Sequence, residues 1–546
     1  MTDSLPIQWF LNREQHQPDA LFLRQPINRK WKTWTYRQAG KEIRCVAAAL
    51  AELPLRSNVA ILSKNCAHWI MADLAIMMAG HVSVPIYPTL GDDAIRSILE
   101  HSQAAGIIIG KLDNYQSQRG GIPDSVMRIS IAAYGIQEGI CWEKLTAEGK
   151  AISQPVKQQY NDLMTIIYTS GTTGKPKGVM HTAGNFAEVI REVDVALPQL
   201  SDQPRMFSYL PLSHIAERVG IEMLSLYKGA MISFAETIDT FAEDLKDTQP
   251  AVFFAVPRIW SKIQEKILSR IEQKKLNILL AIPGLNALIR KKLKKELGLS
   301  RAIYVCSGAA PLSTDIMLWF KRLGITIHQD YGMTEDCVLS HFNLIGRNKW
   351  GSVGRPLPGA ETRISDEGEV RIRSKALMKG YYKEPELTAL AFDEAGFLRT
   401  GDMGRYDEEG YLFITGRLKD QFKTDKGKYI SPGPIEMMLL RHSDIEQVCV
   451  VGMGVPQPMA LVVLSAAGKA KSKDEIAANL GAAIASVNGQ LEAYEQLKTA
   501  VVMREDWTIE NGLLTPTLKV RRNEVEKIYL PHYSKWYHQQ GTVVWA

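Results

Sequence analysis

A run of glycines, hydroxyl side chains and lysines follows the strand-like stretch LMTIIY, in the segment YTSGTTGKPKG at residues 168–178. Glycines let a backbone approach an anion closely, hydroxyls and N–H groups donate hydrogen bonds to it, and lysines neutralise its charge. The segment therefore predicts a phosphate-binding loop, although a polar surface turn would also account for its glycines and serine. The positions assigned to phosphate are Thr169, Ser170, Gly171, Thr172, Thr173, Gly174 and Lys175.

This loop differs from the Walker A motif of many nucleotide-binding proteins. That motif has a glycine five residues before its Gly-Lys pair, where this chain has Thr169. It also has a serine or threonine after the lysine, where this chain has Pro176. The loop therefore indicates another class of phosphate site.

The segment QDYGMTE (329–335) offers groups that suit a nucleotide and its metal ion. Tyr331 presents an aromatic face for an adenine ring, and Thr334 can donate to a phosphate oxygen. Glu335 can hold Mg²⁺, which prefers hard oxygen ligands. Gly332 lies between them and is assigned to the same site. The structural alternative is a helix that begins at Thr334 as its N-cap.

Two further segments suit the rest of a nucleoside. SGAAPL (307–312) places small residues where a flat ring could lie against the backbone, and a simple tight turn is its alternative. In RTGD, Asp402 could accept hydrogen bonds from both ribose hydroxyls, as carboxylates do in other nucleotide sites. The small residues assigned to the ring are Gly308, Ala309 and Ala310.

The loop at 168–178 resembles the phosphate-loop signature of the adenylate-forming (AMP-binding) superfamily, which includes acyl-CoA synthetases and luciferases. Eight further motifs occur in the order expected for that family. They are LPLSHIAER (210–218), VPRIW (256–260), SGAAPL (307–312), QDYGMTE (329–335), GSVGRPLPG (351–359), RTGD (399–402), GRLKDQFK (416–423) and NGLLTPTLKVRR (511–522). The resemblance covers most of the chain and implies ATP, Mg²⁺ and coenzyme A as the cofactors and co-substrates.

The resemblance also implies roles for residues that would otherwise be unremarkable. Lys519, alone a typical solvated charge, matches the lysine that bridges the substrate carboxylate and the α-phosphate. Arg417 matches the partner of the ribose and phosphate, and Lys419 matches the hinge about which a small C-terminal domain rotates. Gly427 matches the glycine that faces the pantetheine tunnel. His214 matches the residue beside the acyl carboxylate, where a lone histidine would otherwise be structural.

Three motifs, LPLSHIAER, VPRIW and NGLLTPTLK, resemble the long-chain fatty acyl-CoA synthetase branch. Some long-chain relatives gate the acyl tunnel with a tryptophan at the position of Arg218, so no such gate is expected here. The implied function is ATP-dependent conversion of a fatty acid to acyl-CoA through an acyl-adenylate. Alternatives are an acyl-ACP synthetase, a fatty acyl-AMP ligase, and a catalytically silent acyl- or nucleotide-binding protein.

Alternating strand-like and helical stretches are the elements that must position these residues. Buried apolar runs such as NVAIL at 58–62 predict strands, and the recurring βα pattern predicts parallel sheets covered by helices in an α/β fold. From about residue 351 the sequence changes to short strand-like stretches with Gly and Asp turns, and the segment after Lys419 is long enough for a separate α+β domain. We expect a large domain at 1–418 and a small, mobile domain at 419–546.

The composition excludes several classes of protein. The six cysteines form no CxxC pair and no Cys/His cluster, which argues against structural zinc or a disulfide framework. No stretch approaches the roughly 18 apolar residues that span a membrane, and the N-terminus has no basic head before an apolar run. These features predict a cytoplasmic protein.

The net charge of +6 is concentrated in one segment. Residues 262–297 hold ten Lys/Arg against three Glu, so the rest of the chain is nearly neutral. This distribution disfavours nucleic acid as a partner. The interleaved apolar residues, with a Pro-Gly break at 283–284, predict a basic amphipathic helix pair that rests on anionic membrane. A solvated hairpin packed on the core is the alternative.

Overall fold

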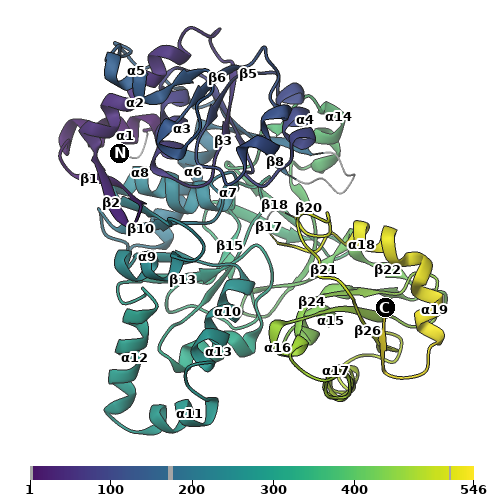
Figure 1. Ribbon diagram of the computed structural model, residues 1–546. Helices are drawn as coiled ribbons and strands as arrows, with labels where there is room; N and C mark the ends of the chain where they lie inside the picture. Colours follow the sequence, from purple (N-terminus) through teal and green to yellow (C-terminus); the bar gives the residue numbers. More distant parts are fainter. Residues whose placement is uncertain (1–3, 170–175, 516–517) are drawn as a thin grey trace.

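The computed structural model describes residues 4–169, 176–515 and 518–546. Figure 1 shows a large N-terminal part, which runs from purple to green, and a small C-terminal part in green and yellow. The small part carries α15–α19 and lies beside the strands that end in β21. The predicted α/β class with a large and a small domain is confirmed.

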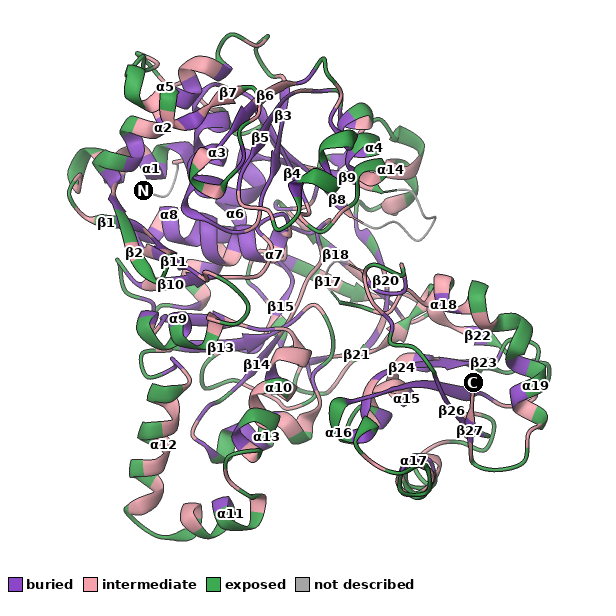
Figure 2. Cartoon of the chain, viewed as in Figure 1, coloured by how far each residue is buried: buried purple, intermediate pink, exposed green. Residues whose placement is uncertain are grey.

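The first sheet has eight strands in the order β19-β9-β8-β4-β3-β5-β6-β7. Every residue of β3 and β4 is buried, as a strand covered by helices on both faces requires. Its helices α2, α3 and α6 fill the densest buried region in Figure 2. The strands are β3 (Asn58–Leu62), β4 (Val82–Ile86), β5 (Ala104–Ile109), β6 (Met127–Ser130), β7 (Ile140–Cys141), β8 (Leu163–Thr169), β9 (Lys177–Thr182) and β19 (Gly380–Tyr381).

Helices of the large part flank this sheet and its neighbours. Helix α2 begins in a capping box in which Thr35 and Gln38 exchange side-chain and backbone hydrogen bonds. Helix α3 is buried on all sides, and His68 and Asp73 are the polar residues in its otherwise apolar sequence. The helices are α1 (Pro6–His16), α2 (Tyr36–Leu50), α3 (Ala67–Met78), α4 (Asp92–Ser102), α5 (Trp142–Glu148), α6 (Ala183–Ala196), α7 (Ile215–Glu217), α8 (Leu224–Lys228), α9 (Phe241–Thr248) and α14 (Pro385–Ala391).

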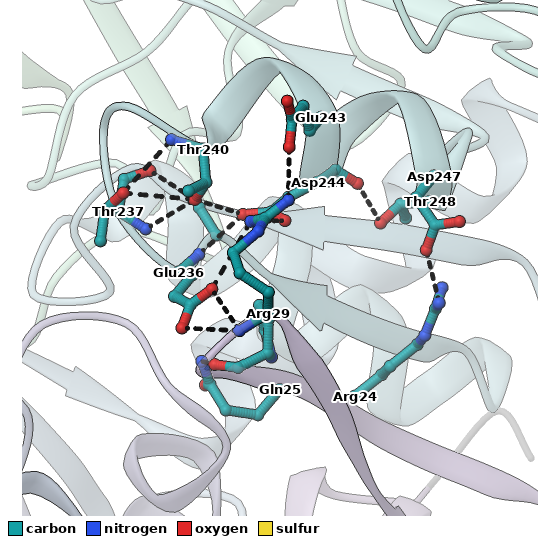
Figure 3. A network of polar contacts seen from close by, with 12 residues as sticks. Arg24, Gln25, Arg29, Glu236, Thr237, Thr240, Glu243, Asp244, Asp247 and Thr248 are labelled. Carbon is teal, nitrogen blue, oxygen red and sulfur yellow. Dashed lines mark hydrogen bonds and ion pairs between the residues drawn. The ribbon is translucent and has the colours of Figure 1, made fainter.

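A second sheet has four strands in the order β10-β11-β1-β2. Its β1–β2 turn is anchored to α9 by ion pairs, which Figure 3 shows. Arg29, with φ of 64°, reaches Glu243 at 2.5 Å and Asp244 at 3.1 Å, and Arg24 reaches Asp247 at 2.5 Å. The strands are β1 (Leu21–Ile27), β2 (Lys30–Thr35), β10 (Arg205–Ser208) and β11 (Met231–Phe234).

The five-stranded sheet β12-β13-β14-β15-β16 carries two of the predicted nucleotide motifs. Strands β12, β13 and β14 are parallel, so their carboxyl ends meet at one edge. The SGAAPL and QDYGMTE motifs both emerge there. The elements are β12 (Val252–Phe254), β13 (Tyr304–Ser307), β14 (His328–Tyr331), β15 (His341–Phe342), β16 (Arg355–Pro356), α10 (Pro257–Leu268) and α13 (Thr314–Arg322).

The basic segment forms two short helices beyond α10, where the sequence predicts one helix before the Pro-Gly break. That prediction is wrong, because α10 ends at Leu268 and a second helix begins at Gln273. Trp319 Nε1 donates to Gln273 Oε1 at 2.7 Å, which attaches this second helix to α13. The helices are α11 (Gln273–Ala281) and α12 (Leu285–Glu296), and both project from the body of the protein in Figure 1.

An antiparallel sheet, β17-β18-β20-β21, leads to the small domain. A single turn of 3₁₀ helix at Leu418–Asp420 follows β21, and the hairpin of β22 and β23 comes next. The strands are β17 (Ala360–Ile364), β18 (Glu369–Ser374), β20 (Leu398–Tyr406), β21 (Leu412–Arg417), β22 (Phe422–Lys423) and β23 (Tyr429–Ile430).

The small domain is built on the sheet β24-β25-β26-β27. Alternate residues of its central strands face two cores: Val448 and Val450 pack toward α15 and α17, whereas Cys449 and Val451 pack toward α18 and α19. The elements are α15 (Pro432–Leu439), β24 (Ile445–Val451), β25 (Met459–Leu464), α16 (Ala466–Lys469), α17 (Lys473–Asn488), β26 (Ala500–Val502), α18 (Arg522–Tyr529), α19 (Tyr533–His538) and β27 (Val543–Trp545).

All six cysteines are free thiols, and no cluster of three metal-ligating side chains exists among the described residues. Within the same part of the chain, no helix is both long and apolar enough to cross a bilayer.

Candidate functional site

Asp402 and Arg417 form the centre of the site. They are directly opposite on the antiparallel strands β20 and β21, which brings their side chains together. Arg417 Nε donates to Asp402 Oδ1 at 2.6 Å, and Tyr331 Oη donates to Asp402 Oδ2 at 2.8 Å. The Asp402 carboxylate raises the pKa of Arg417. Three predicted site residues from three motifs are therefore in direct contact.

A tight turn follows Tyr331. A Cβ on Gly332 would lie 2.7 Å from the Cα of Val338, so only glycine fits this position. Cys337 and Val338 both have positive φ, of 54° and 53°, a costly conformation for such residues that is often found at functional sites. Residues 334–338 form this turn, so the alternative of a helix N-cap at Thr334 is wrong.

Glu335 is held by a residue that the sequence did not single out. Tyr381 Oη donates to Glu335 Oε1 at 3.0 Å, and no other hydrogen bond or ion pair reaches this carboxylate from a described residue. Mg²⁺ commonly binds through one or two carboxylates together with water and substrate phosphates. A carboxylate with a free oxygen, in the turn that follows Tyr331, fits that requirement, so Glu335 could hold the ion.

Thr334 is fixed through its backbone. The Thr334 carbonyl accepts a hydrogen bond of 2.7 Å from His181 Nε2, and burial lowers the pKa of His181 to about 4. Asp336 Oδ1 accepts from the Met333 N–H at 2.9 Å, and burial raises the pKa of Asp336 to about 8. Neither residue was predicted. Both became apparent only from the packing around the turn.

The SGAAPL motif contributes a cramped stretch of backbone at the end of β13. A Cβ on Gly308 would lie 3.0 Å from the ring of Phe254 and 3.1 Å from the Asp330 carbonyl. Ala309 has a φ of 66°, and Ala310 follows it in an exposed loop. A larger side chain at Gly308 would therefore displace Phe254 or the end of β14, next to Tyr331.

Lys519 reaches the same group from the small domain. It lies between Leu514 and Val520, which form a β-bridge, and its N–H donates to Thr515 Oγ1 at 3.0 Å. Loss of hydration lowers the pKa of Lys519 to about 8, the nearby Arg417 guanidinium adds to the shift, and Asp402 opposes it.

His214 lies within electrostatic reach of Lys519. Burial lowers the pKa of His214 to about 4, and the Lys519 ammonium acts in the same direction. His214 Nδ1 accepts a hydrogen bond of 3.2 Å from the Ala216 N–H at the start of α7, so the proton of the neutral ring lies on Nε2. His214 is therefore a neutral donor.

Other predicted residues lie outside this group. Thr169 is the last residue of β8, and Ser170–Lys175 lie outside the described residues. Lys419 lies in the 3₁₀ turn after β21. Gly427, with φ of 75°, lies in the β22–β23 turn, where its N–H donates to the Thr424 carbonyl at 2.9 Å. No contact of the described residues brings Gly427 to Asp402.

Arg218 occupies the position at which some relatives have the gating tryptophan, and it is completely buried. It contacts Asp73 at 2.5 Å and Glu222 at 3.1 Å, and the side chains of both partners are also fully buried. Arg218 Nη1 donates to Thr165 Oγ1 at 2.7 Å. This charged cluster is buried in the core. Its signal in the sequence was the presence of Glu217, Arg218 and Glu222 within the largely apolar stretch 215–226.

Comparison with known proteins places these motifs in a family. The family model described as AMP-binding enzyme matches residues 10–382, and that of the AMP-binding enzyme C-terminal domain matches residues 419–541. Long-chain-fatty-acid--CoA ligase FadD15 of Mycobacterium bovis is 28% identical, over 96% of each chain. The peroxisomal long chain acyl-CoA synthetase 6 of Arabidopsis thaliana is 30% identical, over 94% of this chain and 82% of the relative.

Solved structures share the fold. The anthranilate CoA ligase AuaEII in complex with anthranoyl-AMP superposes with a TM-score of 0.78 at 20% identity, covering 96% of this chain and 97% of that one. The A domain of carboxylic acid reductase from Segniliparus rugosus, in complex with AMP, gives a TM-score of 0.80 at 21% identity, covering 98% and 95%. The chain belongs to the AMP-binding family of adenylate-forming ligases.

Proposed function

We propose that the protein joins a long-chain fatty acid to coenzyme A in two steps. In the first, a carboxylate oxygen of the acid attacks the α-phosphorus of ATP and pyrophosphate leaves, which gives the acyl-adenylate. In the second, the thiolate of coenzyme A attacks the acyl carbonyl and AMP leaves. The observation that carries this proposal is the convergence of Lys519, from the small domain, with Asp402, Arg417 and His214 of the large domain.

The residues of this group suit the first step. Negative charge builds up where the carboxylate oxygen meets phosphorus, so the Lys519 ammonium stabilises that transition state. His214 can donate its Nε2 proton to an oxygen of the acyl carboxylate. Asp402 accepts the ribose hydroxyls, and Arg417 neutralises phosphate. Glu335 would hold Mg²⁺, which when bound neutralises the leaving pyrophosphate.

The names of the relatives support the choice of acid and acceptor. FadD15 and the Arabidopsis synthetase are both named for long-chain acyl substrates and coenzyme A. The test is ATP–pyrophosphate exchange driven by fatty acids of increasing length, followed by transfer to coenzyme A or to a holo-carrier protein. Exchange without transfer to coenzyme A would indicate an acyl-ACP synthetase or an acyl-AMP ligase. Absence of exchange would indicate a silent binding protein.

We further propose the domain boundary at 418/419 and a rotation about Lys419 that exchanges Lys519 for the pantetheine arm. The single 3₁₀ turn at Leu418–Asp420 is a suitable hinge, because a short connection can absorb a change of backbone dihedral. In the rotated state Gly427 would face the thiol. Lys419→Pro should restrict the rotation and slow thiolysis more than adenylation. Equal slowing of both steps would contradict the hinge.

The α11–α12 hairpin is proposed as a peripheral membrane contact. Ile278 and Leu288 are each 64% exposed, and Lys291 and Lys292 lie beside Leu288 on α12. Exposed apolar groups among cations favour an anionic bilayer surface, at about 1 kcal/mol per basic residue. Co-sedimentation with anionic vesicles at low salt tests this. If the variant with Gln at positions 291, 292, 294 and 295 pellets as much as wild type, these lysines do not bind the membrane and the hairpin is an ordinary solvated surface.

A further inference from the structure

A cavity of about 470 Å³ opens at the root of α12, beside the amino ends of β13 and β14. Its volume falls in the range of roughly 300–1,000 Å³ that is typical of small-molecule sites. Apolar and polar groups share its wall, the apolar ones including Leu299, Ile325 and Trp350. Ile303 and Ile345 also line it and stay 38% and 37% exposed, so they offer apolar surface to a bound molecule.

Two cations border this apolar wall, and none of the residues that line the cavity is acidic. The stem of Lys294 passes Gly324, where a Cβ would lie 3.4 Å from Lys294 Cε and 3.6 Å from its Nζ. Lys321 Nζ lies 5.2 Å from the ring centroid of Trp350. No carboxylate of the described residues forms an ion pair with either lysine. Both ammonium groups therefore lack a counter-charge at the cavity.

The cavity is distinct from the nucleotide site. Strands β13 and β14 are parallel, and Gly308 and Tyr331 lie at their carboxyl ends. The cavity is lined instead by Ile303, just before β13, and His328, the first residue of β14. Tyr331 is three positions after His328 along the strand, which corresponds to a rise of about 10 Å.

We propose that this cavity is a second, non-catalytic binding site for a long-chain carboxylate. The apolar wall would cover the alkyl chain, and Lys294 and Lys321 would pair with the carboxylate. Of the amphiphiles that combine a chain with a head group, we choose a fatty acid, because each of its two carboxylate oxygens can accept from one lysine and its narrow chain suits a cavity of this volume. The site lies at the root of the hairpin proposed to contact membrane, so it would hold an acid that leaves the bilayer.

The lysines have a simpler role that the experiment must exclude. Both lie in the last turn of a helix, where cations stabilise the helix dipole without any ligand. In that case, replacing them would change stability but not binding. The test therefore measures where a ligand binds rather than activity.

The probe is hexadecanoic acid that carries a diazirine on its chain, cross-linked to the full-length protein without ATP. We expect labelled peptides from residues 299–305, 321–328 and 345–350. Lys294→Gln with Lys321→Gln should reduce labelling at low probe concentration about five- to tenfold, as two partly exposed ion pairs would. The matched control is Lys291→Gln with Lys292→Gln, which removes the same charge from the solvent side of α12 and should leave labelling unchanged.

Ile303→Asp gives a second, independent variant, since it places a repelling charge on the wall at a position that is already partly exposed. It should abolish labelling of these peptides. Label confined to other peptides, or an equal loss in the two lysine variants, would overturn the proposal. Because the experiment uses no ATP and reads the position of the label, its outcome is separate from that of the proposed ligase reaction.

Discussion

The lowered pKa of Lys519 makes the first half-reaction sensitive to alkaline pH. If the ammonium is required for attack on the α-phosphorus, only the protonated enzyme forms acyl-adenylate. With a pKa of about 8, the ratio of protonated to neutral Lys519 is about 10:1 at pH 7 and about 1:10 at pH 9. The active fraction thus falls from about nine-tenths to about one-tenth, so kcat/KM for adenylation should fall about tenfold as pH rises across this interval.

The assay is pyrophosphate release in the absence of coenzyme A, with fatty acid and ATP limiting. Under these conditions kcat/KM reports the pKa of the free enzyme. Bound ATP adds negative charge near Lys519, which favours its protonated form, so the fall in kcat should occur at higher pH than the fall in kcat/KM. Lys519→Arg keeps a cation at all accessible pH values, so its activity, although lower, should not fall between pH 7 and 9.

Thiolysis of supplied acyl-adenylate is the internal control, because it does not use this cation. Lys519→Ala should lose most acid-dependent pyrophosphate release and keep most thiolysis. A profile for kcat/KM that stays flat to pH 9.5 would refute the assigned role. The assigned role would also be refuted if kcat/KM of Lys519→Ala fell over the same alkaline range, because another residue would then be the titrating group.

Three further predictions concern the thiol side, the domain contact and the core. Gly427→Leu should slow transfer to coenzyme A and spare adenylation, and transfer at the wild-type rate would refute the tunnel assignment. Arg258 of the VPRIW motif pairs with Glu446 of β24, so this ion pair holds the small domain in its present orientation. Arg258→Gln should therefore raise the rate of thiolysis relative to adenylation about fivefold, which corresponds to the roughly 1 kcal/mol of a partly exposed ion pair. The test is the ratio of half-reaction rates, and Glu446→Gln should give the same ratio if the pair acts as a unit. Arg218→Ala leaves two buried carboxylates without a cation and should lower the free energy of unfolding by about 3–5 kcal/mol. The triple variant Asp73→Asn, Arg218→Met, Glu222→Gln removes all three charges and should recover much of that loss. Chemical denaturation measures both variants.

Local sequence was sufficient to predict the elements that carry the nucleotide group. The apolar run at 58–62 is a buried strand because burial on both faces leaves no room for polar alternation. The RTGD and GRLKDQFK motifs meet because the register of the β20–β21 pair places Asp402 opposite Arg417. The roles of Lys519 and His214 came from resemblance alone, and the structure brings these two residues within electrostatic reach of one another.

Features that depend on distant contacts could not be predicted. Arg218 and Asp73 are 145 positions apart, and nothing in either local sequence indicates the other. The break between α10 and α11 contains no glycine or proline, and one apolar periodicity continues through it. The separate helix α11 is explained by its contact with Trp319, a residue of another helix. Helical periodicity identifies a buried face but not where tertiary packing divides a helix.

The charges of the nucleotide group suggest why the small domain should leave after the first step. Asp402 uses one acceptor position on each oxygen for Arg417 and Tyr331, and an ionised carboxylate has about four, so two remain for ribose hydroxyls. Burial is the main cause of the lowered pKa of Lys519, and repulsion between Arg417 and Lys519 adds to it. A triphosphate between them would relieve this repulsion and favour the present orientation of the small domain. Departure of pyrophosphate removes most of that negative charge, so the repulsion returns and favours withdrawal of Lys519. The electrostatics of adenylation would thereby drive the domain toward the orientation that thiolysis requires.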